Sequence, residues 1–70
     1  MLGVDADVLA LLVEARAGTH AEKFAAAGFE TMEDLEDLDD QRLRDEVGVR
    51  IAQHRRRILR ARDSALGLFA

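Results

Sequence analysis

Residues 39–59, with the sequence DDQRLRDEVGVRIAQHRRRIL, contain the local signals that decide the fold. The opening aspartate pair can cap a helix that carries Leu43 and Val47, and Gly48 is suited to end that helix. A second and longer helix is predicted from about Arg50 into the high sixties. The stretch therefore predicts two helices that are joined at a glycine.

Capping residues and glycines also divide the residues before this stretch into predicted helices. A first helix is predicted to begin after Asp5 or Asp7. The segments THAE (residues 19–22) and TMED (residues 31–34) fit the capping box, in which side chains three residues apart bind each other's backbone amides. The first box would open a helix that stops at Gly28, and the second would open a very short one. Because no strand-like alternation occurs, the sequence predicts an all-α fold, a small bundle of five helices with a long C-terminal helix.

The length of 70 residues is enough for one small domain, which we assign to residues 1–70 with a helical core at about 5–69. A chain of this size buries only about 60% of its unfolded surface, and short helices are not stable alone in water. The bundle must therefore fold as a unit. Its predicted core residues are Leu9, Leu12, Phe24, Phe29, Leu35, Leu38, Leu43, Val47, Val49, Ile58, Leu59 and Leu66.

Several classes of site are not expected from the composition. The absence of cysteine excludes disulfides and thiolate metal sites and leaves the redox compartment open. The apolar stretch at residues 8–13 is too short for a signal peptide or a membrane span. The acidic run DLEDLDD lacks the central glycine of a calcium loop. We expect no metal, cofactor, membrane or small-molecule ligand, and an intracellular, cytoplasmic location with the nucleus left open.

The titratable residues form no catalytic constellation. His20 and His54 are the only histidines, and few groups could converge on either of them. Each is better interpreted as a packing or hydrogen-bonding residue. We therefore expect no enzyme activity and no catalytic residue.

The charges are segregated along the chain. Residues 1–46 hold thirteen acids and four bases, a formal charge of −9, whereas residues 47–70 hold six arginines and one acid, a charge of +5. The densest acidic run, EDLEDLDD at residues 33–40, has six carboxylates and no base. These runs are either solvated faces or parts of a binding surface. The arginines open a helix, where the macrodipole disfavours positive charge, and this cost favours a functional explanation.

The ordered series of motifs from His20 to Leu59, HAEKFAAAGFETMEDLEDLDDQRLRDEVGVRIAQHRRRIL, resembles the sterile alpha motif domain. One family pattern, L-T-x-x-D-L-x-x-L-G-I, is matched by Leu38, Asp39, Leu43, Val47, Gly48 and Val49. Another, G-H-R-x-K-I-L, is matched by His54, Arg55, Arg57, Ile58 and Leu59. The chain departs from the family at His20, Ala15, Ala17, Gln53 and Arg62, the last standing where an apolar residue is common. These departures predict looser packing of the first and last helices and modest stability.

The resemblance implies a non-catalytic five-helix bundle with two surfaces that join head to tail. By position, the acidic mid-loop face would be formed by Glu33, Glu36, Asp37, Asp39 and Asp40. The basic end-helix face would be formed by Arg50, Ile51, Ala52, Gln53, Arg56 and Arg57. Two different patches on one molecule make a heterologous contact, which builds rings or helical filaments. We therefore expect self-association into oligomers or a helical polymer that scaffolds a larger protein.

Three questions stay open from the sequence. Ile51 is either the apolar centre of the basic face or a core residue one heptad before Ile58, and we favour the core. The partner is either a second copy or another sterile alpha motif domain, because charge complementarity serves both. RNA binding through the arginines is a further alternative, disfavoured by the acidic half of the chain and the lack of an evident exposed aromatic residue.

Overall fold

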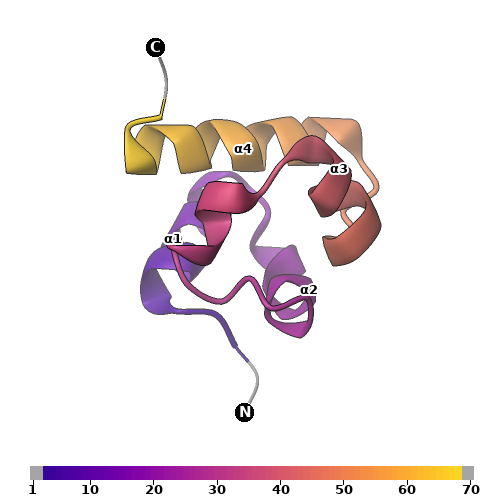
Figure 1. Ribbon diagram of the computed structural model, residues 1–70, viewed down its shortest axis with the longest axis horizontal. Helices are drawn as coiled ribbons and strands as arrows, with labels where there is room; N and C mark the ends of the chain where they lie inside the picture. The colour runs from indigo at the N-terminus through magenta and orange to yellow at the C-terminus, as the bar shows by residue number, and fades with distance from the viewer. Residues whose placement is uncertain (1–2, 69–70) are drawn as a thin grey trace.

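The computed structural model describes residues 3–68, which form four α-helices and three short turns of 3-10 or π helix (Figure 1). The α-helices are α1 (Ala6–Glu14), α2 (Ala21–Ala26), α3 (Asp40–Arg42) and α4 (Ala52–Leu66). The 3-10 turns η1 (Gly18–His20) and η2 (Asp34–Asp37) and the π-helical turn η3 (Leu43–Val47) lie between them. The all-α prediction is confirmed, since residues 3–68 contain no strand.

The count of five helices needs a small correction. The very short helix expected after Thr31 is a single 3-10 turn, η2, which leaves four α-helices. The fourth expected helix begins as α3 and widens into the π-helical turn η3 before Gly48. The long helix α4 ends at Leu66, and the expected helical limit at residue 69 lies outside the described residues. The order of the elements is otherwise as predicted.

Helix α4 lies across one side of the molecule and supports the other elements (Figure 1). It contacts α1, α3 and η2, which are far from it in sequence. In Figure 1, η2 lies beside the C-terminal half of α4, whereas α3 lies near its N-terminal end. Two elements of the acidic half of the chain, η2 and α3, therefore contact the basic helix α4 near its two ends.

Nine of the twelve predicted core residues are buried: Leu12, Phe24, Phe29, Leu35, Leu38, Leu43, Val47, Val49 and Ile58. Leu59 and Leu66 are partly buried, and Leu59 packs against this core. Leu9 is 44% exposed, so its prediction as core is wrong. The inward face of α1 is formed by Val8, Leu11 and Leu12, and each helical residue is turned about 100° from the last, which leaves Leu9 outside.

The core interpretation of Ile51 is also wrong, because this side chain is 54% exposed. Ile51 is the N-cap residue of α4 and has an extended backbone with φ −83° and ψ 117°. It therefore stands outside the helical periodicity that would have placed it on the same face as Ile58. Ala15 and Ala17, two of the departures that predicted looser packing, are both buried in the core.

Of the four predicted caps, two are formed and two are not. Asp5 is the N-cap residue of α1, but its side chain makes no capping hydrogen bond. Thr31 and Asp34 bind reciprocally, since the Asp34 amide donates to the Thr31 hydroxyl at 3.2 Å and the Thr31 amide donates to the Asp34 carboxylate at 3.0 Å. Asp39 caps α3 by accepting from the Arg42 amide at 2.7 Å. The box predicted at residues 19–22 is absent, because η1 occupies its first residues and α2 starts without a side-chain cap. Gly48 has φ 91°, the left-handed conformation expected of a helix-ending glycine.

Candidate protein-interaction surfaces

The acidic segment, residues 33–40, alternates buried leucines with exposed carboxylates. Leu35 and Leu38 are almost completely buried and fix the segment to the core. The carboxylates between them point away from the core because successive residues of the turn face different directions. The segment therefore presents its charge outward from two apolar anchors.

Three of the six carboxylates in the acidic segment make internal bonds. Asp34 accepts hydrogen bonds from the amides of Glu30 and Thr31, both at 3.0 Å, and these bonds lower the pKa of its carboxyl group. Asp39 caps α3, as described above. Asp40 pairs with Arg55 of α4 at 2.7 Å. Asp39 and Asp40, both predicted for the mid-loop face, therefore bind other parts of the molecule, one as a helix cap and the other as an ion-pair partner.

The other three carboxylates, Glu33, Glu36 and Asp37, are exposed. None of them makes a hydrogen bond or ion pair from its side chain with any residue from 3 to 68. They are the part of the predicted mid-loop face whose charge is not compensated inside the molecule.

Arg62 of α4 lies beneath the acidic segment. Its Nη1 atom donates to the carbonyl oxygens of Leu35 at 2.5 Å, Leu38 at 2.8 Å and Glu36 at 3.4 Å. The residue is only 9% exposed. Arg62, one of the departures that predicted looser packing of the last helix, is thus buried, and its guanidinium makes hydrogen bonds where an apolar residue would make contacts.

The predicted end-helix residues gather at the start of α4. Arg50, Ile51, Ala52, Gln53 and Arg56 are exposed. Arg57 is half-buried, and its Nε atom donates to the carbonyl oxygen of Ala15 at 2.8 Å. Ala15 is the C-cap residue of α1, so Arg57 satisfies a helix end and supplies a positive charge where the α1 dipole is negative.

Arg55, like Arg57 and Arg62, is a framework arginine, which here means one whose guanidinium is bound inside the molecule. It is 9% exposed, and besides its pair with Asp40 its Nη1 atom donates to the carbonyl oxygens of Val49 at 3.1 Å and Arg50 at 2.9 Å. It therefore ties the loop before α4 to the start of α3. Of the six arginines after residue 46, three are bound internally in this way: Arg55, Arg57 and Arg62.

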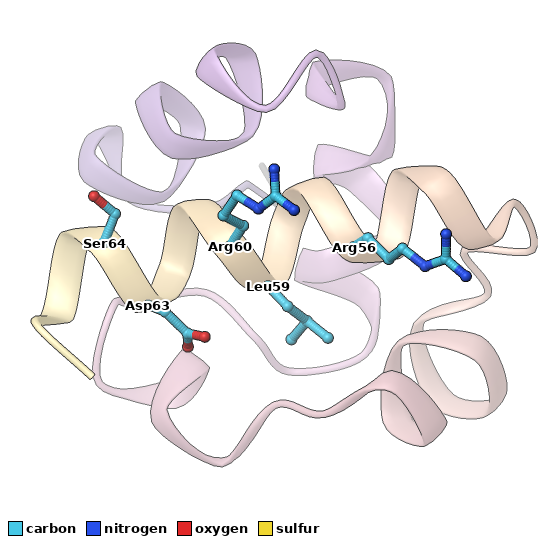
Figure 2. A pocket seen from close by; sticks show the side chains of 5 residues that line it. All are labelled: Arg56, Leu59, Arg60, Asp63 and Ser64. Carbon is cyan, nitrogen blue, oxygen red and sulfur yellow. The ribbon is translucent and has the colours of Figure 1, made fainter. Parts of the chain in front are cut away.

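Arg60 extends the basic surface by one turn. It lines a shallow depression on α4 together with Arg56, Leu59, Asp63 and Ser64 (Figure 2). Arg60 is exposed and, within the described part of the chain, has no hydrogen-bonded or ion-paired partner for its side chain. Arg60 is not among the residues predicted for the end-helix face, although its spacing of four from Arg56 places it on the same side of the helix.

The two histidines bind each other. His20 Nε2 and His54 Nδ1 are 3.1 Å apart, which joins the start of α2 to the first turn of α4. Burial lowers the pKa of His20, and the nearby charge of Lys23 and the His54 ring lower it further. The contact agrees with the hydrogen-bonding role that the sequence predicts for each histidine.

The described residues were also examined for clustered metal ligands and for membrane-spanning helices. Within residues 3–68, no cluster of three or more histidine and carboxylate side chains could hold a metal ion. None of the described helices combines the length and apolar character needed to cross a membrane.

The family model of the SAM domain (sterile alpha motif) matches residues 4–63. No curated protein and no solved structure matches the chain.

Proposed function

Because the chain belongs to the sterile alpha motif domain family, whose members are protein-interaction modules, we propose that it self-associates head to tail. The acidic segment of one copy meets the start of α4 of the next, and the resulting oligomer or helical polymer scaffolds a larger protein. The module has no catalytic role. The observation that carries this proposal is the pair of uncompensated charge sets on one small domain, one acidic and one basic.

The free charges make the two faces complementary. Glu33, Glu36 and Asp37 supply three exposed carboxylates, and Arg50 and Arg56 supply two exposed guanidinium groups at the start of α4. Arg60 adds a third guanidinium group. None of these side chains has a hydrogen-bonded or ion-paired partner among residues 3–68. Opposite potentials of this kind steer encounter and fix the orientation of the partners.

Charge alone does not account for a stable contact. A solvent-exposed ion pair contributes only about 0.2–1 kcal/mol, whereas micromolar affinity requires about −8 kcal/mol. The exposed Ile51 lies among the basic residues and is the apolar centre that the contact needs. We assign Asp39, Asp40 and Arg57 to the support of the two faces, while Ala52 and Gln53 lie at the contact itself.

The proposal is tested with one variant for each face, limited to residues that make no internal bond. Glu36→Lys with Asp37→Lys should disable the acidic face, and Arg50→Glu with Arg56→Glu should disable the basic face. Each variant should be monomeric in sedimentation velocity, while the wild type forms a concentration-dependent series of oligomers. A mixture should form a heterodimer that grows no further, because each variant keeps one intact face.

A matched control separates this result from an effect of net charge. Glu14→Lys with Glu22→Lys makes the same charge change at exposed positions outside the acidic segment, so assembly should persist. Raising the salt concentration from about 0.05 M to about 0.5 M should weaken wild-type assembly by screening. A wild type that stays monomeric at high micromolar concentration in low salt would contradict self-association, as would a mixture that remains monomeric.

Hetero-association with another sterile alpha motif domain is the alternative, since the same two faces would serve it. It predicts a monomeric wild type that binds such a domain and loses binding in only one of the two face variants. RNA binding is a weaker alternative, because the phenylalanines within the described residues, Phe24 and Phe29, are buried and unavailable for base stacking. Salt-dependent binding to an RNA hairpin without self-association would favour RNA.

A further inference from the structure

We propose that Arg62 is the positioning residue of the acidic face: its buried guanidinium binds the backbone of the acidic segment and sets the direction of its free carboxylates. This inference rests on the proposed head-to-tail function. It assigns to the C-terminal half of α4 a role in the interaction surface that Arg62 itself does not touch.

The geometry ties one side chain to three points of the segment. The three acceptor carbonyls, of Leu35, Glu36 and Leu38, lie 24 to 27 residues before Arg62 in the chain. A further bond from its Nε atom to Asp63 at 2.6 Å holds the guanidinium plane. The side chain of Arg62 is only 11% exposed, so these bonds are made away from bulk water.

The backbone bonds of the acidic segment are those of one short turn, and Arg62 adds donors to its carbonyls. The turn η2 is a single 3-10 turn, and carbonyl groups at a helix end lack intrahelical partners. The Leu35 carbonyl also accepts from the Leu38 amide at 3.1 Å, so Arg62 is its second donor. Leu38 follows the turn in extended conformation, with φ −75° and ψ 133°, so its carbonyl is not part of a helix.

Electrostatics gives a second reason for an arginine at this position. Six carboxylates within eight residues repel one another, and the segment contains no base. A buried cation beneath the turn offsets this repulsion, and charge-assisted hydrogen bonds are roughly twice as strong as neutral ones. The planar guanidinium can reach several carbonyls at once, which a lysine ammonium does with less geometric control.

The bonds also determine which way the carboxylates face. The side chain of Glu36 has no hydrogen-bond partner within the described residues, whereas its backbone carbonyl oxygen accepts from Arg62. With the carbonyls of the turn drawn toward α4, the side chains of Glu36 and Asp37 are directed to solvent. Arg56 of the basic face lies about 9 Å from Arg62 along α4, at 1.5 Å per residue. Arg60, which extends that face, shares no hydrogen bond with the acidic segment within the described residues, so loss of Arg62 should disturb one face and spare the other.

The test introduces Arg62→Met, which keeps an unbranched apolar stem without donors, into each of the two face variants. In the Arg50→Glu, Arg56→Glu background, binding to the other variant uses the acidic face and should weaken about tenfold or more. In the Glu36→Lys, Asp37→Lys background, binding uses the basic face and should stay within about twofold. Equal weakening through both faces, or no weakening through the acidic face, would overturn the proposal.

Two further variants separate positioning from charge and folding. Arg60→Met removes the same charge from the same helix at an exposed position, and should leave binding through the acidic face unchanged. Arg62→Lys keeps the charge without the planar fork and should restore binding only in part. Full restoration by lysine would assign the effect to charge rather than to the bonds with the carbonyls.

A readout on the monomer distinguishes this proposal from the proposed function. Arg62→Met should speed hydrogen exchange of the amides in residues 35–38, while amides of residues 55–58 keep their protection. If the wild-type faces fail to bind each other, head-to-tail assembly is wrong, and the exchange pattern still decides whether Arg62 holds the segment. Unchanged exchange at residues 35–38 would refute its positioning role.

Discussion

The acidic segment and the start of α4 carry opposite charges and are supported in different ways. The acidic segment is irregular and rests on buried groups, namely Leu35, Leu38 and the guanidinium of Arg62. The start of α4 has no buried side chain from residue 50 to residue 54, and from Ala52 on it belongs to a 15-residue helix. Only the residues just before the helix are held by a buried arginine, Arg55, which donates to the carbonyls of Val49 and Arg50. An irregular binding surface therefore depends on internal bonds along its whole length, whereas a helical one needs them mainly where its backbone leaves the helix.

Both regions also divide their charges into framework and free groups. Three carboxylates of the acidic segment and three arginines of the last 24 residues are bound internally, and the others face solvent. The formal charges of −9 and +5 thus overstate what a partner meets. Substitutions within these two regions can test that division, beginning with the largest effect.

The first comparison contrasts the apolar anchors of the two regions. Leu35→Ala should lower the free energy of unfolding by about 2–5 kcal/mol, because it removes a fully buried side chain. Ile51→Ala should change it by less than about 0.5 kcal/mol, since the side chain is exposed. Urea denaturation of the two variants measures both values. A large loss on Ile51→Ala would show that this residue packs inside the domain after all.

A second comparison uses two adjacent arginines of α4. Arg55→Met should cost about 1–3 kcal/mol, because the carbonyls of Val49 and Arg50 lose a buried donor. Arg56→Met should be nearly neutral for stability and should weaken assembly instead. Thermal melts and sedimentation of the same two samples should therefore rank the variants in opposite order. Equal melting temperatures would contradict the framework role of Arg55.

A third comparison is made within the acidic segment. Asp39→Ala removes the cap of α3 and should cost about 1 kcal/mol. Asp37→Ala removes a free carboxylate, so it should leave unfolding unchanged while reducing self-association. Asp39→Asn serves as the control, because asparagine caps helices nearly as well as aspartate. If Asp39→Asn destabilises as much as Asp39→Ala, the cap is not the cause.

The smallest expected effect is a dependence on pH that separates the two regions. The pKa of His20 is lowered from 6.5 in the folded state, so the unfolded chain binds more protons and stability falls as the pH drops below about 6.5. The lowered pKa of Asp34 acts in the same sense, but only as the pH falls below 3.8. Mild acid should therefore loosen the start of α4 before the acidic segment, as hydrogen exchange can detect.

A matched variant isolates the histidine contribution. His20→Gln should flatten the stability profile between pH 7 and pH 5, because glutamine does not titrate in that range. The profile of the wild type should be steeper there. Identical profiles for the two proteins would show that His20 does not cause the dependence on pH.

The parts of the fold that the sequence predicted correctly depend on local signals. The cap at Asp39, the reciprocal bonds of Thr31 and Asp34, and the left-handed Gly48 each involve residues within a few positions of one another. Apolar spacing likewise located most of the core. Errors arose where a helix boundary moved, as at Ile51, which precedes α4 and so escapes its periodicity.

The roles of the arginines could not be predicted in this way. Arg57 binds the carbonyl of Ala15, 42 residues earlier, and Arg62 binds that of Leu35, 27 residues earlier. Neither acceptor has a side-chain signature, because every backbone carbonyl is the same. Only the packing of α4 against α1 and η2 shows which arginine side chains bind carbonyl groups inside the molecule and which are left exposed for a partner.

The continuity of α4 has a geometric consequence for any assembly built from this domain. Arg56 belongs to the basic face, Arg62 positions the acidic face, and both lie on one unbroken helix. The rotation and translation that relate successive copies therefore depend on the number of helical residues between them. One residue inserted between the two would turn one face by about 100° relative to the other and shift it by about 1.5 Å. The pitch of a filament, or its closure into a ring, would then change although every contact residue stayed the same.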